Sequence, residues 1–113
     1  EADMIDWIRV RELREEIGAD AFEEVLDLFL EEVETALAVL RTATTEDDLE
    51  AQLHFLKGSA LNLGFKALAN LCADGEAKSG AGARDSVDIP RIVSGYEASK
   101  AAFLAGIAEG IAA

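Results

Sequence analysis

Residues 20–40 read DAFEEVLDLFLEEVETALAVL, and apolar side chains recur there at every third or fourth position. Such spacing places one apolar stripe along an α-helix, so it predicts a long amphipathic helix with one buried face. Asp20, followed three residues later by Glu23, matches a capping box and predicts that the helix begins here. The stripe consists of Phe22, Val25, Leu26, Phe29, Val33, Ala36, Leu37 and Leu40.

Helical spacing also marks the segments on either side of this helix. A shorter helix is predicted to come first and to end near Gly18. Its apolar residues are Ile5, Ile8 and Leu13. Residues 42–48, TATTEDD, interrupt the spacing, and Thr45 with Asp48 matches a second capping box that predicts the start of the next helix.

Three further helices complete the chain. The first is predicted to end at Gly64 and the second to cover residues 66–78, followed by a flexible loop at 80–86, GAGARDS. Asp88 and Pro90 predict the start of the last helix. The apolar residues that mark these helices are Leu49, Leu53, Leu56, Ala60, Leu63, Leu68, Leu71, Cys72, Ile92, Val93, Tyr96, Phe103 and Ile107. The pattern predicts an all-α fold, an antiparallel four-helix bundle with a short additional N-terminal helix.

The composition limits what the chain can be. Its 113 residues, half of them hydrophobic, are predicted to form one domain, residues 1–113, with a substantial core. The only cysteine, Cys72, cannot form an intramolecular disulfide. No apolar run approaches the length of a membrane span and no signal peptide is recognisable, so we expect a cytoplasmic protein without a membrane partner.

Charge is distributed unevenly along the chain. Residues 1–50 hold 17 acidic and 4 basic side chains, a net charge of −13, whereas residues 51–113 hold six of each. Nucleic acids bind to basic surfaces, so this distribution argues against a nucleic-acid partner. A solvated, solubilising helix face is the simplest interpretation of the acidic half.

The only histidine, His54, is predicted to lie on the flank of the third helix. At about 100° per residue, the apolar residues of this helix fall within about 40° of Leu49, and His54 lies about 140° away. Lys57 lies about 80° from Leu49 and Gly58 about 180° from it, one turn beyond the histidine. The ring therefore faces water beside a surface that the glycine leaves bare.

This arrangement suits a nucleophilic histidine that must enter a partner's active site. Gly58 would let the partner's backbone approach the imidazole, and Lys57 would supply positive charge where a phosphoryl group arrives. Each feature alone also has an ordinary explanation, as a surface histidine or a tolerated helical glycine. A single histidine without an H-E-x-x-H pattern does not predict a metal site.

Residues 54–64, HFLKGSALNLG, followed by Leu68 and Cys72, resemble the signature of the histidine-containing phosphotransfer (HPt) domains of bacterial phosphorelays. That signature reads H-x-L-K-G-S-A-x-x-L-G with an L-x-x-x-C segment after it, and the length and helix order extend the resemblance over the whole chain. It implies a phosphorelay intermediate that relays a phosphoryl group between a histidine kinase, or a receiver-domain aspartate, and another response-regulator receiver.

The resemblance also implies roles for single residues. His54 would accept the phosphoryl group on Nε2, Lys57 would favour its charge, Gly58 would clear the partner's approach, and Ser59 would be a nearby polar support. Glu76 stands where the family often has a Gln or Glu that hydrogen-bonds the other ring nitrogen and fixes the tautomer.

The family's partners are receiver domains of response regulators and a sensor histidine kinase. The resemblance implies a monomer that is not an enzyme and has no cofactor, because the receiver supplies the Mg²⁺ and acidic residues. The residues expected to dock the receiver are Phe55, Leu61 and Lys66. A receiver's pocket is acidic in this family, so the partner is expected to avoid residues 1–50.

Two residues depart from the family pattern. Leu53 stands where Ala is common, as a core variation. Gly75 replaces a Leu at a core-facing position, and we expect it to loosen the helix that carries Glu76.

Two other functions are compatible with the sequence. One is a docking module that regulates a receiver or kinase without being phosphorylated, although the intact His54 argues against it. The other is the phosphoacceptor domain of a larger, chemotaxis-type histidine kinase, which Glu76 would also fit.

Overall fold

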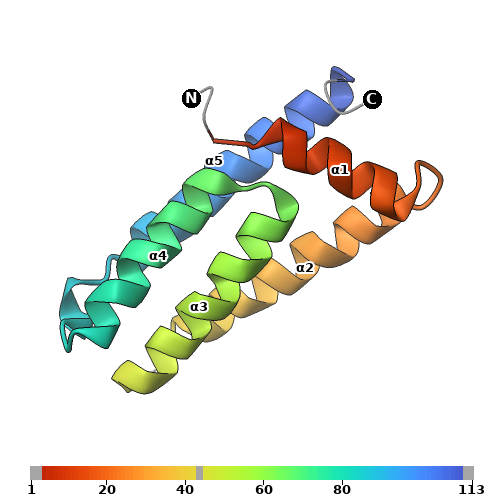
Figure 1. The fold of residues 1–113 in the computed structure, drawn as a ribbon. Coiled ribbons are helices and arrows are strands. Elements are labelled where there is room, and N and C mark those ends of the chain that lie inside the picture. The colour runs from red at the N-terminus through yellow and green to blue at the C-terminus, as the bar shows by residue number, and fades with distance from the viewer. Residues whose placement is uncertain (1–3, 43–44, 111–113) are drawn as a thin grey trace.

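The computed structural model describes residues 4–42 and 45–110, and this part of the chain is helical, without a strand (Figure 1). Its elements are α1 (Trp7–Ile17), α2 (Phe22–Leu40), α3 (Glu46–Leu63), α4 (Lys66–Gly80), a short 3₁₀ helix η1 (Arg84–Ser86) and α5 (Ile89–Ala108). Helices α2 to α5 run up and down in turn, while α1 crosses one end of the bundle (Figure 1). The predicted four-helix bundle with a short N-terminal helix is confirmed.

Side-chain and glycine caps set half of the ends of helices α1 to α5. Thr45 accepts a hydrogen bond from the backbone N–H of Asp48 at 3.1 Å, so the predicted cap of α3 is confirmed. Asp88 caps α5 in the same way. Gly64 ends α3 in the left-handed conformation, at φ 84°, and a Cβ there would lie 2.8 Å from the carbonyl oxygen of Asp6. Glycine is therefore required at this turn for both conformation and space.

The predicted capping box at Asp20 is wrong. Helix α2 begins at Phe22, and the preceding Ala21 has helical backbone angles and no side-chain cap. The N–H of Ala21 instead donates to the carbonyl oxygen of Gly18, so a turn occupies the place of the expected cap. The predicted interruption at 42–48 falls partly on residues 43–44, which lie outside the described residues.

The structure adds two details, one about an apolar residue of the first helix and one about the expected loop. Ile8 is 67% exposed, because Val10 and Leu13 fix the buried face of α1 and put Trp7 on it instead. The Trp7 ring stacks on Phe103 of α5, with ring centroids 5.9 Å apart. The expected flexible loop at 80–86 includes the last residue of α4 and the helix η1.

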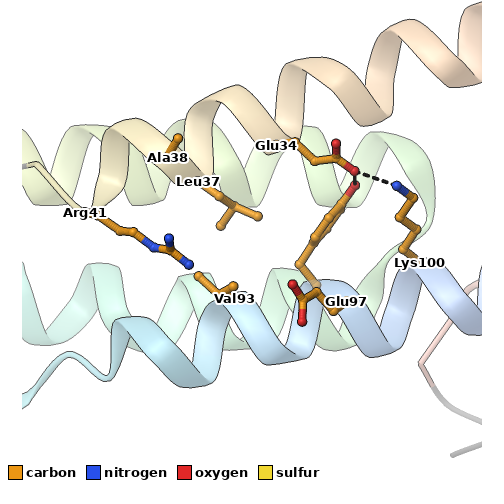
Figure 2. A pocket seen from close by; sticks show the side chains of 8 residues that line it. Glu34, Leu37, Ala38, Arg41, Val93, Glu97 and Lys100 are labelled. Carbon is orange, nitrogen blue, oxygen red and sulfur yellow. Dashed lines mark hydrogen bonds and ion pairs between the residues drawn. The ribbon is translucent and has the colours of Figure 1, made fainter.

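The core runs the length of the bundle, and an aromatic cluster fills the end beneath α1. Phe65, in the turn between α3 and α4, packs edge-on against Phe103 and also contacts Tyr96. On another side, a groove of about 370 Å³ separates α2 from α5. Glu34 of α2 spans it, accepting hydrogen bonds from the Tyr96 hydroxyl at 2.6 Å and from Lys100 at 2.7 Å (Figure 2).

Candidate functional site

His54 lies near the middle of α3 on its solvent-facing flank, as predicted. The five apolar residues assigned to the core face of this helix are all buried, whereas the His54 side chain is 70% exposed. Those five residues are Leu49, Leu53, Leu56, Ala60 and Leu63. Helical geometry therefore places the ring at the surface while its helix is firmly anchored.

Glu76 reaches His54 from α4. Its Oε2 atom lies 2.8 Å from His54 Nδ1, although the two residues are 22 positions apart in the chain. An ionised carboxylate only accepts hydrogen bonds, so Nδ1 carries the ring proton and donates a hydrogen bond to Glu76. In the neutral ring the lone pair is then on Nε2, which has no bonding partner among the described residues.

Lys57 completes the contact from the next turn of α3. Its Nζ atom lies 2.8 Å from the second carboxylate oxygen, Glu76 Oε1, and its side chain is 30% exposed. The Lys57 ammonium lowers the pKa of Glu76 most strongly; the His54 hydrogen bond lowers it further, and desolvation opposes both. Glu76 is thus held ionised between a lysine and the histidine.

The turn between α3 and α4 aligns the two helices that carry the site. The N–H of Phe65 donates to the carbonyl oxygen of Ala60 at 2.8 Å, which closes the turn directly after α3. The segment around α1 braces it, because Asp6 N donates to Gly64 O at 2.7 Å and Arg9 Nε donates to Asn62 O at 3.0 Å. These bonds fix how α4 leaves α3 and hence where Glu76 lies.

The remaining predicted residues lie around this contact without joining it. Gly58 is exposed, and nothing lies within 4 Å of the position that a Cβ would take, so the surface beside the ring is open. Ser59 is half-buried and makes no described hydrogen bond to the site. Phe55 and Leu61 are 49% and 55% exposed. Lys66 is exposed at the start of α4, about 15 Å along that helix from Glu76.

Sequence reasoning missed two hollows on the surface of α3, one of which includes the ring. Asp47 and Glu50 of α3 line a hollow of about 430 Å³ together with His54 and Glu76. Asp47 and Glu50 lie seven and four residues before the histidine, which places them on its face of the helix and could have revealed them.

The second missed feature is a groove of about 410 Å³ between α3 and α2. It contains Phe55 together with Leu28, which is 60% exposed, and Glu31. A partner that covers Phe55 therefore also meets α2, which belongs to the acidic residues 1–50 that the partner was expected to avoid.

Comparison with known proteins agrees with this geometry. A sequence model of the Hpt domain matches residues 24–102. The chain belongs to the Hpt family. It is also similar to the phosphorelay protein LuxU of Vibrio vulnificus strains YJ016 and CMCP6, with 32% identity over 113 residues in each. The alignment covers 96% of this chain and 98% of each relative.

The protein is therefore a histidine phosphotransfer component of a two-component phosphorelay, and Hpt proteins interact with kinases and response-regulator receivers. Proteins of this kind are phosphotransfer intermediates without ATP-binding machinery. Among the described residues, no cluster of His, Cys, Asp and Glu could hold a metal ion. None of the described helices is both long and apolar enough to cross a membrane.

Proposed function

We propose that His54 is the phosphoacceptor of this Hpt protein and that it reacts through Nε2. The observation that carries the proposal is the 2.8 Å contact between His54 Nδ1 and Glu76 Oε2, made by a ring that is 70% exposed. The contact assigns the proton to one nitrogen, and the exposure makes the other nitrogen accessible to a partner.

The chemistry follows from this tautomer. The Nε2 lone pair attacks the phosphorus of a receiver's aspartyl phosphate, the N–P bond forms, and the aspartate carboxylate leaves with the electrons of the broken P–O bond. The ring gains positive charge while Nδ1 keeps its proton. Glu76, held ionised, stabilises that charge across the 2.8 Å hydrogen bond.

The other site residues support transfer rather than take part in it. Lys57 orients Glu76 and adds positive charge near the incoming phosphoryl group. Gly58 leaves room for the partner beside the ring. Phe55 and Leu61, with Leu28 of α2, provide apolar contact for the receiver. We further propose a single-domain monomer that is not itself an enzyme, with Mg²⁺ bound by the receiver.

Labelling with potassium phosphoramidate, a small phosphoryl donor, tests the acceptor without any partner protein. We expect an acid-labile, base-stable phosphoryl group on His54, attached at Nε2 as determined by ¹⁵N and ³¹P NMR. His54→Gln should abolish this label and leave the helical circular dichroism spectrum unchanged, because the side chain is exposed and outside the core. Since the chain has one histidine, the assignment is unambiguous.

Substitutions of Glu76 separate its role from that of the acceptor. Glu76→Gln keeps an oxygen that can accept from Nδ1 and should still direct reaction to Nε2, whereas Glu76→Ala should lose that selectivity. Glu97→Ala is the matched control, because Glu97 lines the groove between α2 and α5. A label that persists in His54→Gln would overturn the assignment of the acceptor.

A further inference from the structure

Two residues that face each other across the α3–α4 interface immediately precede the two residues of the site. Leu53 precedes His54 and Gly75 precedes Glu76. Leu53 is fully buried, and its Cδ1 atom lies 3.1 Å from the position that a Cβ on Gly75 would take. That distance is shorter than the optimal separation of about 3.5–4.0 Å between carbon atoms.

Gly75 is needed here for space and not for its backbone conformation. It lies within α4 and does not have a positive φ, and a glycine inside a helix is less favourable than alanine. A Cβ on it would also lie 3.3 Å from Val87 Cγ1 and 3.6 Å from Ile92 Cδ1. Side chains therefore surround the backbone of Gly75 on three sides, and adding a side chain there requires a neighbouring group to move.

We propose that Leu53 and Gly75 form a positioning pair that sets the separation of α3 and α4 and thereby the hydrogen bond between Glu76 and His54. A larger residue at position 75 pushes α4 away from Leu53 and carries the backbone of Glu76 with it. A hydrogen bond at 2.8 Å is lost when its atoms separate beyond about 3.5 Å, so a displacement below 1 Å is sufficient. This inference rests on the proposed role of Glu76 in phosphotransfer.

The test exchanges volume between the two positions. Four variants are compared with wild type: Gly75→Ala, Gly75→Leu, Leu53→Ala and the double variant Leu53→Ala/Gly75→Leu. The first readout is the tautomer of His54, from long-range ¹H–¹⁵N NMR at alkaline pH. The second is the phosphoramidate labelling rate, and the third is the melting temperature. If the pair had a purely structural role, only the melting temperature would change.

Gly75→Leu should lower the population of the Nδ1–H tautomer and slow labelling about tenfold. A tenfold change corresponds to the free energy lost with one hydrogen bond to a charged group. Gly75→Ala should have a smaller effect of the same sign, and it keeps the test decisive if the leucine variant does not fold. The double variant should restore both readouts toward wild type, because the volume removed at position 53 accommodates the new side chain.

Gly95→Ala is the matched control. A Cβ on Gly95 would lie 2.5 Å from Leu71 Cδ1, so this variant also crowds α4 but from the α5 side. It should change the melting temperature without changing the tautomer. A wild-type tautomer and rate in Gly75→Leu, or no recovery in the double variant, would overturn the positioning role. Failure of the wild-type protein to label would instead refute the proposed function. The tautomers of the variants would still show whether Leu53 and Gly75 position Glu76.

Discussion

Lys57 Nζ lies 2.8 Å from Glu76 Oε1, so the lysine of the HPt signature is paired with a carboxylate before any phosphoryl group arrives. Glu76 contacts Lys57 through Oε1 and His54 through Oε2, so the charge of Lys57 affects His54 through Glu76. Lys57 therefore acts on the ring's partner as well as on an incoming anion, and an ion pair and a hydrogen bond join three side chains from two helices.

The first prediction concerns the charge of Glu76. Lys57→Met should raise the pKa of Glu76 toward its ordinary value of 4.5, because the lysine is the largest cause of the lowered value. Carboxyl ¹³C NMR titration measures this pKa directly. Lys78→Met is the control, since Lys78 pairs with Asp74 on the same helix at 3.0 Å. An unchanged titration of Glu76 in Lys57→Met would show that the ion pair does not exist in solution.

A second prediction links stability to pH through Glu34. Its pKa is lowered first by Lys100 and then by the Tyr96 hydroxyl. The resulting stabilisation is complete above the ordinary pKa of 4.5 and is lost as pH falls through the lower pKa of the folded state. Glu34→Gln should therefore flatten the acid limb of a plot of melting temperature against pH. Glu97→Gln, in the same groove, should leave that limb steep; equal curves for the two variants would contradict this assignment.

Cys72 provides a third prediction. Burial raises the pKa of its thiol to about 12, with the charge of Glu76 contributing in the same direction. Because only the thiolate reacts, alkylation by iodoacetamide at pH 8 should be slow in the folded protein and fast in denaturant. The labelling rate then reports the opening of the α3–α4 core, and Gly75→Leu should raise it. Rapid labelling of the native wild-type protein would show that Cys72 is not enclosed.

Substitutions of Gly58 test helix stability and partner access separately. Gly58→Ala should stabilise the protein by up to about 1 kcal/mol, because the position is open and alanine favours helix over glycine. Gly58→Gln should keep the fold and the phosphoramidate labelling but slow transfer from a phosphorylated receiver. Thermal melts and the two transfer rates measure these effects. A normal receiver rate in the glutamine variant would mean that Gly58 is not a clearing for the partner.

The last prediction concerns the groove between α2 and α3. Phe55→Ala and Leu28→Ala should each weaken receiver binding by an amount that barely changes with salt, because apolar contact is not screened. Lys57→Ala should slow transfer more at low salt than at high salt. Ile8→Ala on α1, which is 67% exposed, is the apolar control. Amide shifts on α2 that do not move during receiver titration would exclude this helix from the interface.

The sequence by itself determined the helices and the outward direction of His54. Both depend on local periodicity, since residues three and four apart share a face of a helix whatever packs against it. The caps at Thr45 and Asp88 and the turn at Gly64 were predictable for the same reason, because each acts within a few residues. The predicted cap at Asp20 is wrong because the turn after Gly18 extends to Ala21. That turn depends on how the chain leaves α1 at the end of the bundle.

Only the tertiary structure decided which groups meet across helices. The contact of Glu76 with His54 spans 22 residues and depends on the α3–α4 turn, so helical periodicity could not predict it and only the family resemblance implied it. In the sequence, Leu53 and Gly75 are two separate departures from the family pattern, and Gly75 was expected to loosen α4. In the fold they face each other, and the leucine lies against the glycine's bare backbone at 3.1 Å from its missing Cβ. Packing depends on the combined volume at an interface, which a chain read one residue at a time does not reveal.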